Sequence, residues 1–235
     1  SEGLAAKSQK AKEAMSARRF GEAAALYGQL VRALPRNPGL RVNLGLALHA
    51  GGRYREAARH FRAVLKEQPD NGPAWLMVGL AHLKLGEPTR AIVPLERAVR
   101  AEPNNKIARP ELADTCLVLG RPEDAAAHFQ KLTELEPENP KAWQGLGLSY
   151  LSLSRRAALG QAYMRTGRPE QAITQLKAAL EIDEDGSLYY QLGQAYQRSG
   201  QMLLARRALR KFEEISSSAR ERRRRLPGEF EITPP

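Results

Sequence analysis

The feature that most constrains the fold of this chain is a pattern that returns about every 34 residues. Its clearest copy is the stretch 38–71, where two apolar stripes at helical spacing are separated by Gly51 and Gly52 and followed by Pro69. Glycine costs about 1 kcal/mol inside a helix, and proline cannot donate the helical hydrogen bond, so these residues mark helix ends. The stretch predicts two short helices around a turn, and a pair this short needs neighbours to bury its apolar faces.

The copies share three further signals: a small residue in the first helix, a glycine at the turn, and an alanine followed four residues later by Phe or Leu. We expect the small residue to lie where the two helices of a pair approach most closely, since only a small side chain fits there. The small positions are Gly45, Gly79, Ala113, Gly147, Gly160 and Gly193. The turn positions are Gly52, Gly86, Gly120, Gly167 and Gly200, with Ser154 as the exception.

This pattern resembles the tetratricopeptide repeat family, whose repeats read W-x2-L-G-x2-Y, then Ala, Phe and Pro. Trp75 and Trp143 occupy the Trp position, and the Tyr position is held by Tyr150, Tyr163 and Tyr196. The resemblance covers about residues 4–215 and implies an all-α fold, a right-handed superhelical α-solenoid of tandem helix-turn-helix repeats. It also implies that Trp75, Trp143 and Cys116, which stands at the Tyr position, are buried packing residues.

The sequence predicts a single solenoid over residues 1–235. The repeat boundaries are about 4–37, 38–71, 72–105, 106–139, 140–152, 153–185 and 186–219, of which the fifth is incomplete. In the last repeat we expect Met202, Leu203 and Phe212 to pack. Residues 220–235 are predicted to form a basic helix end, stopped by Leu226, Pro227 and Gly228, and an extended C-terminal tail.

Repeat five lacks its second helix, because the residues after Ser154 already read as the first helix of repeat six. Either about 21 residues are missing from the sequence at this point, or residues 140–166 form one long helix. We favour the missing segment. An unpartnered first helix would expose Trp143, Leu146 and Tyr150 at about 1.5–3 kcal/mol per side chain, which is large against a domain stability of about 5–15 kcal/mol.

The resemblance also implies that the first helices line a concave face. The positions that face it are unusually apolar for a surface, and exposed apolar patches commonly mark binding sites. We therefore expect repeats two to five to bind an apolar or amphipathic peptide or helix. Alternatively, these residues pack against their own neighbours, or the C-terminal tail or a second copy fills the groove. The predicted groove residues are Val42, Asn43, Leu46, His49, Leu76, Leu80, Leu83, Lys84, Ile107, Asp114, Leu117, Val118, Gln144, Leu148 and Leu151.

A net charge of +11 and a pI near 10.0 favour acidic partners. The basic patch that supports this comprises Arg220, Arg222, Arg223, Arg224 and Arg225. It suggests an alternative function, a basic adaptor that docks on nucleic acid or an anionic surface. We favour the peptide-binding scaffold over nucleic-acid binding, because aromatic residues make up only 6% of the chain and leave few side chains to stack on bases.

We predict no catalytic site, so the chain is not expected to be an enzyme. The histidines His49, His60, His82 and His128 form no ligand pair at helical spacing, and no phosphate-binding or nucleophile motif occurs, so we expect no metal and no cofactor. The single cysteine excludes an internal disulfide, and no apolar run of eighteen residues indicates a transmembrane helix. The expected partners are a protein or peptide and a second copy of the chain. The location is open between the cytoplasm and, if a leader was removed, export.

Overall fold

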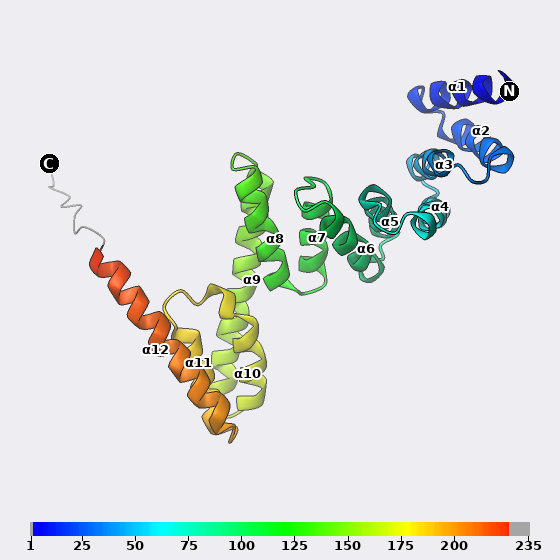
Figure 1. Cartoon of the computed structure of the whole chain (residues 1–235). Helices are drawn as coiled ribbons and strands as arrows, with labels where there is room; N and C mark the ends of the chain where they lie inside the picture. Colours follow the sequence, from blue (N-terminus) through cyan, green and yellow to red (C-terminus); the bar gives the residue numbers. More distant parts are fainter. Residues whose placement is uncertain (1, 226–235) are drawn as a thin grey trace. The chain divides into compact units, whose positions relative to one another are not determined.

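The computed structural model describes residues 2–225, and every regular element within them is a helix (Figure 1). The first eight helices are α1 (Glu2–Ser16), α2 (Phe20–Ala33), α3 (Pro38–Ala50), α4 (Tyr54–Glu67), α5 (Gly72–Lys84), α6 (Pro88–Ala101), α7 (Ala108–Val118) and α8 (Pro122–Leu135). They are followed by α9 (Pro140–Arg165), α10 (Pro169–Ala178), the short 3-10 helix η1 (Leu180–Ile182), α11 (Ser187–Arg198) and α12 (Met202–Arg225). The predicted stop at Leu226, Pro227 and Gly228 and the predicted tail lie outside the described residues.

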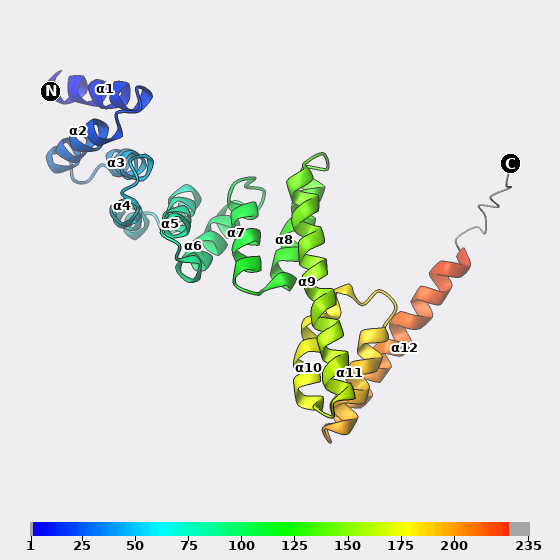
Figure 2. The same ribbon diagram turned by 180° about the vertical axis from the view of Figure 1, so that it is seen from behind.

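Helices α1–α8 form successive helix pairs, and each helix packs on the one before it and the one after it (Figures 1 and 2). Asparagine and proline start the first helices of the pairs: the side chains of Asn37 and Asn71 accept hydrogen bonds from the backbone N–H groups of Leu40 and Ala74, and a proline follows within the first turn. The all-α solenoid predicted from the repeat pattern is confirmed.

Glycines end the first helices as predicted. Gly52, Gly86 and Gly120 have positive φ angles of 79°, 70° and 69°, a conformation that side chains disfavour, and Gly167 and Gly200 repeat it further along the chain. Each turn brings the chain back so that the second helix packs on the first.

The small residue of each first helix has the predicted role. A Cβ atom added to Gly45 would lie 2.8 Å from the ring of Phe61 on α4, and one added to Gly79 would lie 2.7 Å from Leu95 on α6. Both Phe61 and Leu95 are fully buried. The two helices of a pair therefore approach too closely for any larger side chain.

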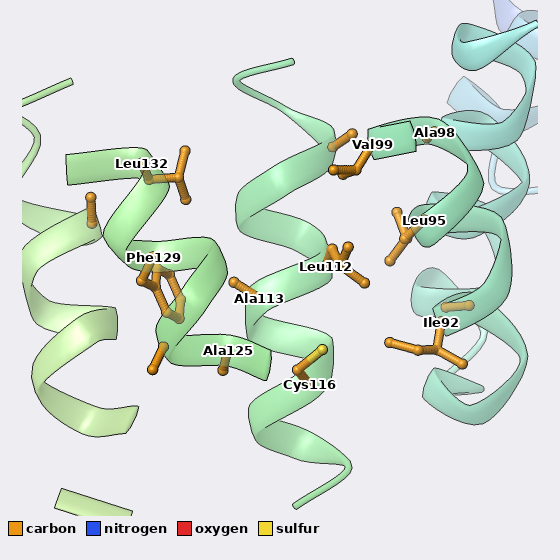
Figure 3. Packing of buried hydrophobic residues seen from close by; sticks show 14 of the residues in the cluster. Ile92, Leu95, Ala98, Val99, Leu112, Ala113, Cys116, Ala125, Phe129 and Leu132 are labelled. Atoms are coloured by element: carbon orange, nitrogen blue, oxygen red, sulfur yellow. The ribbon is translucent and has the colours of Figure 1, made fainter. Parts of the chain in front are cut away.

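Two buried clusters run through helices α1–α8. One is built around Phe61, and the other contains Leu95, Leu112 and Phe129 (Figure 3). Cys116 is buried in the second cluster, as predicted. The half-buried indole of Trp75 contacts both clusters, and its N–H donates a hydrogen bond of 2.7 Å to the carbonyl oxygen of Pro69.

The chain divides into two compact units, Ser1–Leu146 and Gly147–Pro235, and the boundary falls inside α9. In the second unit α10 packs on α11, and α11 on α12. Their core contains Ala172, Leu176, Leu192 and Ala205. Two residues predicted to pack do not: Met202 and Leu203, at the start of α12, are exposed, Leu203 by 75%. Phe212 is half-buried, with its ring centroid 5.4 Å from that of Tyr190.

Helix α9 runs without a break through residues 152–157, so the predicted missing segment is wrong and the alternative of one long helix is correct. No glycine or proline occurs between residues 148 and 159, and Ser154 replaces the glycine that would reverse the chain. The predicted burial of Trp143 is also wrong, since 54% of this residue is exposed. The energetic argument for a missing segment therefore overestimated how strongly those side chains resist exposure.

Candidate functional site

The predicted groove residues lie on α3, α5, α7 and α9, except for Ile107, which immediately precedes α7. The exposed members are Lys84, Ile107, Asp114, Val118, Gln144, Leu148 and Leu151. The half-buried members are Val42, Asn43, Leu46, His49, Leu80, Leu83 and Leu117, and Leu76 is buried. Leu148 and Leu151 belong to the second unit, so the surface described for the first unit comprises the residues up to Gln144.

Much of the predicted apolar surface packs inside the first unit. Leu76 belongs to a buried cluster, against which Leu80, Leu83 and Leu117 pack, while Val42 and Leu46 pack against the other cluster. These residues form an apolar floor that is only partly accessible. The most exposed apolar side chain of the predicted set is that of Val118, at 71%.

A row of charged residues crosses this floor from one first helix to the next. Burial raises the pKa of Glu111, and the neighbouring carboxylate of Asp114 raises it further, while Lys84 on α5 opposes both effects. Loss of hydration likewise raises the pKa of Asp114, although the residue is classed as exposed, and Lys141 on α9 opposes that shift. Glu111 and Lys141 were not predicted, but Glu111 stands three residues before Asp114, on the same side of the helix.

His49 lies beside this row on α3. Its ring meets that of Tyr54 edge to face, with centroids 5.0 Å apart. Burial lowers the pKa of the His49 imidazole, and the positive charge of Lys84 lowers it further. The imidazole is therefore neutral at neutral pH, and its buried Nε2 atom has no hydrogen-bond partner. A ligand group that reached Nε2 would satisfy it.

The second unit holds a polar pocket of about 270 Å³ that the sequence analysis missed. It lies between α9 and α11 and is lined by Gln161, Met164, Arg165, Gln191, Gln194 and Arg198. Arg198 donates a hydrogen bond of 3.0 Å to the carbonyl oxygen of Met164, and the side-chain oxygen of Gln191 is buried without a partner. The repeat pattern held the signal, because Gln161 and Gln194 are ninth positions of repeats six and seven.

A second missed pocket, of about 640 Å³, lies between α2, α3 and α4 and is mainly charged. Arg41 at its edge forms an ion pair of 2.8 Å with Glu67 and donates a second hydrogen bond to the carbonyl oxygen of Pro35. Burial lowers the pKa of His60 in this pocket, and the positive charges of Arg41 and Arg59 lower it further. Opposite charges are already paired here, so the pocket is not a strongly basic site.

The predicted basic patch is described only in part. Arg220 and Arg222 are exposed on α12, and the side chains of Arg223, Arg224 and Arg225 lie outside the described residues. Arg222 lines a pocket of about 790 Å³ together with the acidic stretch Asp183, Glu184 and Asp185. Acidic neighbours weaken the attraction of Arg222 for phosphate groups.

Other chemistry has little support in the part of the chain that the structure describes. Among residues 2–222 no group of three His, Cys, Asp or Glu side chains could hold a metal ion. Burial raises the pKa of the Cys116 thiol to about 11, which disfavours the reactive thiolate. Within the described helices, none is both long and apolar enough to span a membrane.

Sequence models of the tetratricopeptide repeat family match most of the chain. The matched ranges are 8–71 and 50–106, 82–148, 160–200, and 186–218. The ranges end at residue 148 and resume at residue 160, on either side of the middle of α9. No curated protein matches the chain.

Solved structures of similar fold are tetratricopeptide repeat proteins or are similar to them. A tetratricopeptide repeat protein from Parabacteroides merdae has a TM-score of 0.59 at 16% identity, over 92% of this chain and 94% of its own. MamA AMB-1 has a TM-score of 0.56 at 24% identity, over 77% and 92% of the two chains. YrrB, described as a TPR protein with an unusual peptide-binding site, has a TM-score of 0.55 at 23% identity, over 77% and 87%. At these identities the similarity concerns the fold.

Proposed function

The chain belongs to the tetratricopeptide repeat family, and on that premise we propose that it is a non-enzymatic scaffold that binds a peptide along the first helices of its first unit. The binding surface consists of the exposed and half-buried groove residues of α3, α5 and α7, together with Gln144. Its partner is a protein segment with apolar and basic side chains.

The observation that carries this proposal is the row of charges on the partly apolar floor. Glu111 and Asp114 have lost hydration, so their charged forms are destabilised in the free protein. A bound segment that brings a lysine, an arginine or backbone N–H groups to these carboxylates would recover part of that energy. The unpartnered Nε2 atom of His49 offers a further polar contact, on the next first helix.

Two further observations support a peptide ligand. The side chain of Val118 is exposed next to the charged row, so it can contact an apolar side chain of the partner. YrrB, which has a similar fold, is described as having a peptide-binding site. Its low identity to this chain leaves the residues of that site unassigned here, so the choice of residues rests on the geometry of this chain.

The test is selection of peptides from a random library displayed on phage, followed by fluorescence anisotropy with the selected peptides. Val118→Glu places a charge on the proposed surface, whereas Val93→Glu changes another exposed valine, on the second helix α6. We expect Val118→Glu to weaken binding by about tenfold or more and Val93→Glu to leave it unchanged. Equal effects of the two substitutions, or selection of no peptide, would contradict the proposal.

The pH dependence of binding gives an independent check. Protonation of Glu111 and Asp114 removes the charges that hold a basic peptide, and both groups have raised pKa values in the free protein. Binding should therefore weaken, as the pH falls, at a higher pH than an ordinary carboxylate would require. The double substitution Glu111→Gln and Asp114→Asn should remove this pH dependence.

A further inference from the structure

The first half of α9 has the sequence of a first helix, but the structure gives it no second helix. In the other pairs the small residue of the first helix lies directly against a large residue of the second. A Cβ atom added to Gly160 or Gly193 would lie 2.7 Å from Leu176 or Leu209, respectively, as for Gly45 and Gly79 in the first unit. At Gly147, the equivalent position in repeat five, no atom lies within 4 Å.

The residues around Gly147 show the same difference. Tyr150 stands at a position that is buried in the complete repeats, where Leu48, His82, Cys116 and Tyr196 occupy it. In α9, 40% of Tyr150 is exposed, and Leu151 beside it is exposed by 48%. Gly147, Tyr150, Leu151 and Ser154 have the spacing of one helical stripe, and all four are exposed. We call these four residues the α9 docking face.

We propose that the α9 docking face binds one amphipathic α-helix of a partner protein, in the place that a second helix takes in the other repeats. The partner helix carries a small residue followed four positions later by Phe or Leu, and this large side chain rests on Gly147. Every residue of the face belongs to the second unit. The site is separate from the proposed peptide surface on α3, α5 and α7.

The second helices of this chain define the chemistry of the partner. Their shared pattern is an alanine followed four residues later by a large apolar residue, as in Ala57 and Phe61, Ala91 and Leu95, Ala172 and Leu176, and Ala205 and Leu209. The alanines are buried at the interface, and the large residues cover the glycines of the first helices. A helix with this pattern is therefore complementary to Gly147 and its neighbours.

A second copy of the chain fits this face less well than a foreign helix. In the described residues Phe61, Leu95, Phe129 and Leu176 are buried in their own cores, and Leu209 lies against Gly193. A second copy would have to release one of these helices from its own fold before offering it to α9. A partner with a free amphipathic helix has no such cost.

The probe is a synthetic peptide with the sequence of residues 122–135, which contains the alanine and phenylalanine of the pattern. A side-chain staple on its outward face holds it helical, since a free peptide of this length is only marginally helical in water. The control peptide carries Phe129→Ala and has the same charge. Binding to the full chain is measured by fluorescence anisotropy.

Two variants of the full chain are matched to each other. Gly147→Leu fills the space that the large side chain needs, and it leaves the fold intact because no atom lies within 4 Å of the added Cβ. Ala162→Leu adds the same side chain at an exposed position of α9, about four turns further on. We expect the peptide to bind the unchanged chain and Ala162→Leu alike, and to bind Gly147→Leu about tenfold or more weakly.

Three results would overturn the proposal: no binding of the stapled peptide up to its solubility limit, equal binding of the Phe129→Ala peptide, or equal binding to Gly147→Leu. Light scattering tests the competing occupant. A dimer of the unchanged chain that becomes a monomer in Gly147→Leu would assign the face to a second copy. Val118→Glu should leave binding of the stapled peptide unchanged, so failure of the peptide-binding surface and failure of this proposal can be distinguished.

Discussion

Helix α5 and the first half of α9 carry the same residues at the same spacing but have different surroundings. Trp75 and Gly79 on α5 correspond to Trp143 and Gly147 on α9. Leu95 of α6 covers Gly79, and Trp75 contacts two buried clusters. Trp143 and Gly147 are exposed, although the indole N–H of Trp143 donates a hydrogen bond of 2.7 Å to the carbonyl oxygen of Pro137, as Trp75 does to Pro69.

The difference begins at the turn. Gly86 follows α5 with a φ of 70°, and the chain reverses into α6. Ser154 takes the equivalent place in α9 and continues the helix to Arg165. The comparison teaches that the motif of a first helix prepares a surface for a second helix, while the turn residue decides whether the same chain supplies it.

The largest expected difference between the two regions concerns their leucines. Leu95→Ala removes a fully buried side chain and should lower the free energy of unfolding by about 2–5 kcal/mol. Leu151→Ala removes a side chain that is nearly half exposed and should cost less than about 1 kcal/mol. Chemical denaturation followed by circular dichroism measures both. A loss at Leu151 as large as that at Leu95 would mean that the α9 docking face is already covered in solution.

The glycines should respond in opposite directions. Gly79→Ala places a Cβ atom 2.7 Å from a buried leucine, an overpacking cost of about 1–3 kcal/mol, offset in part by a gain in helix propensity of about 1 kcal/mol. Gly147→Ala meets no atom within 4 Å, so only the gain of about 1 kcal/mol remains.

Thermal unfolding of the two alanine variants checks this pair. The midpoint should fall for Gly79→Ala and rise for Gly147→Ala, relative to the unchanged chain. Gly3 provides a control for helix propensity alone, because it also has no atom within 4 Å and lies in α1, far in sequence from either site. A fall in the midpoint for Gly147→Ala would show that a neighbour occupies the space in front of Gly147.

The sequence predicted the elements well because their signals are local. Turn glycines, proline and the helical spacing of apolar residues define each pair, and the close approach at Gly45 and Gly79 follows from the absence of a side chain. The burial of Trp143 could not be predicted in this way. Its local pattern equals that of Trp75, but its exposure depends on whether a second helix exists to cover it.

The candidate site was only partly predictable for a related reason. Position within the repeat identified Asp114 and Val118 as surface residues, but it could not show that Leu76 is buried by the adjacent helices. The raised pKa values of Glu111 and Asp114 arise from neighbours on α5 and α9, which the spacing within one helix does not reveal. The polar pocket of Gln161 and Gln194 was accessible to the positional argument, had it been applied to repeats six and seven.

The smallest expected difference tests the turn itself. Gly86→Ala forces a residue with a side chain into a positive φ, at a cost of about 1–2 kcal/mol, whereas Gly86→Asn should cost less because asparagine tolerates this conformation. Ser154→Ala should instead stabilise α9 by about 0.5 kcal/mol, since alanine has the higher helix propensity and residue 154 lies inside a continuous helix. Hydrogen–deuterium exchange reads each region separately: amide exchange near the end of α5 should speed up in Gly86→Ala, and exchange in the middle of α9 should slow in Ser154→Ala. Faster exchange in Ser154→Ala would indicate that the chain turns at this residue in solution, and the contrast between α5 and α9 would then be lost.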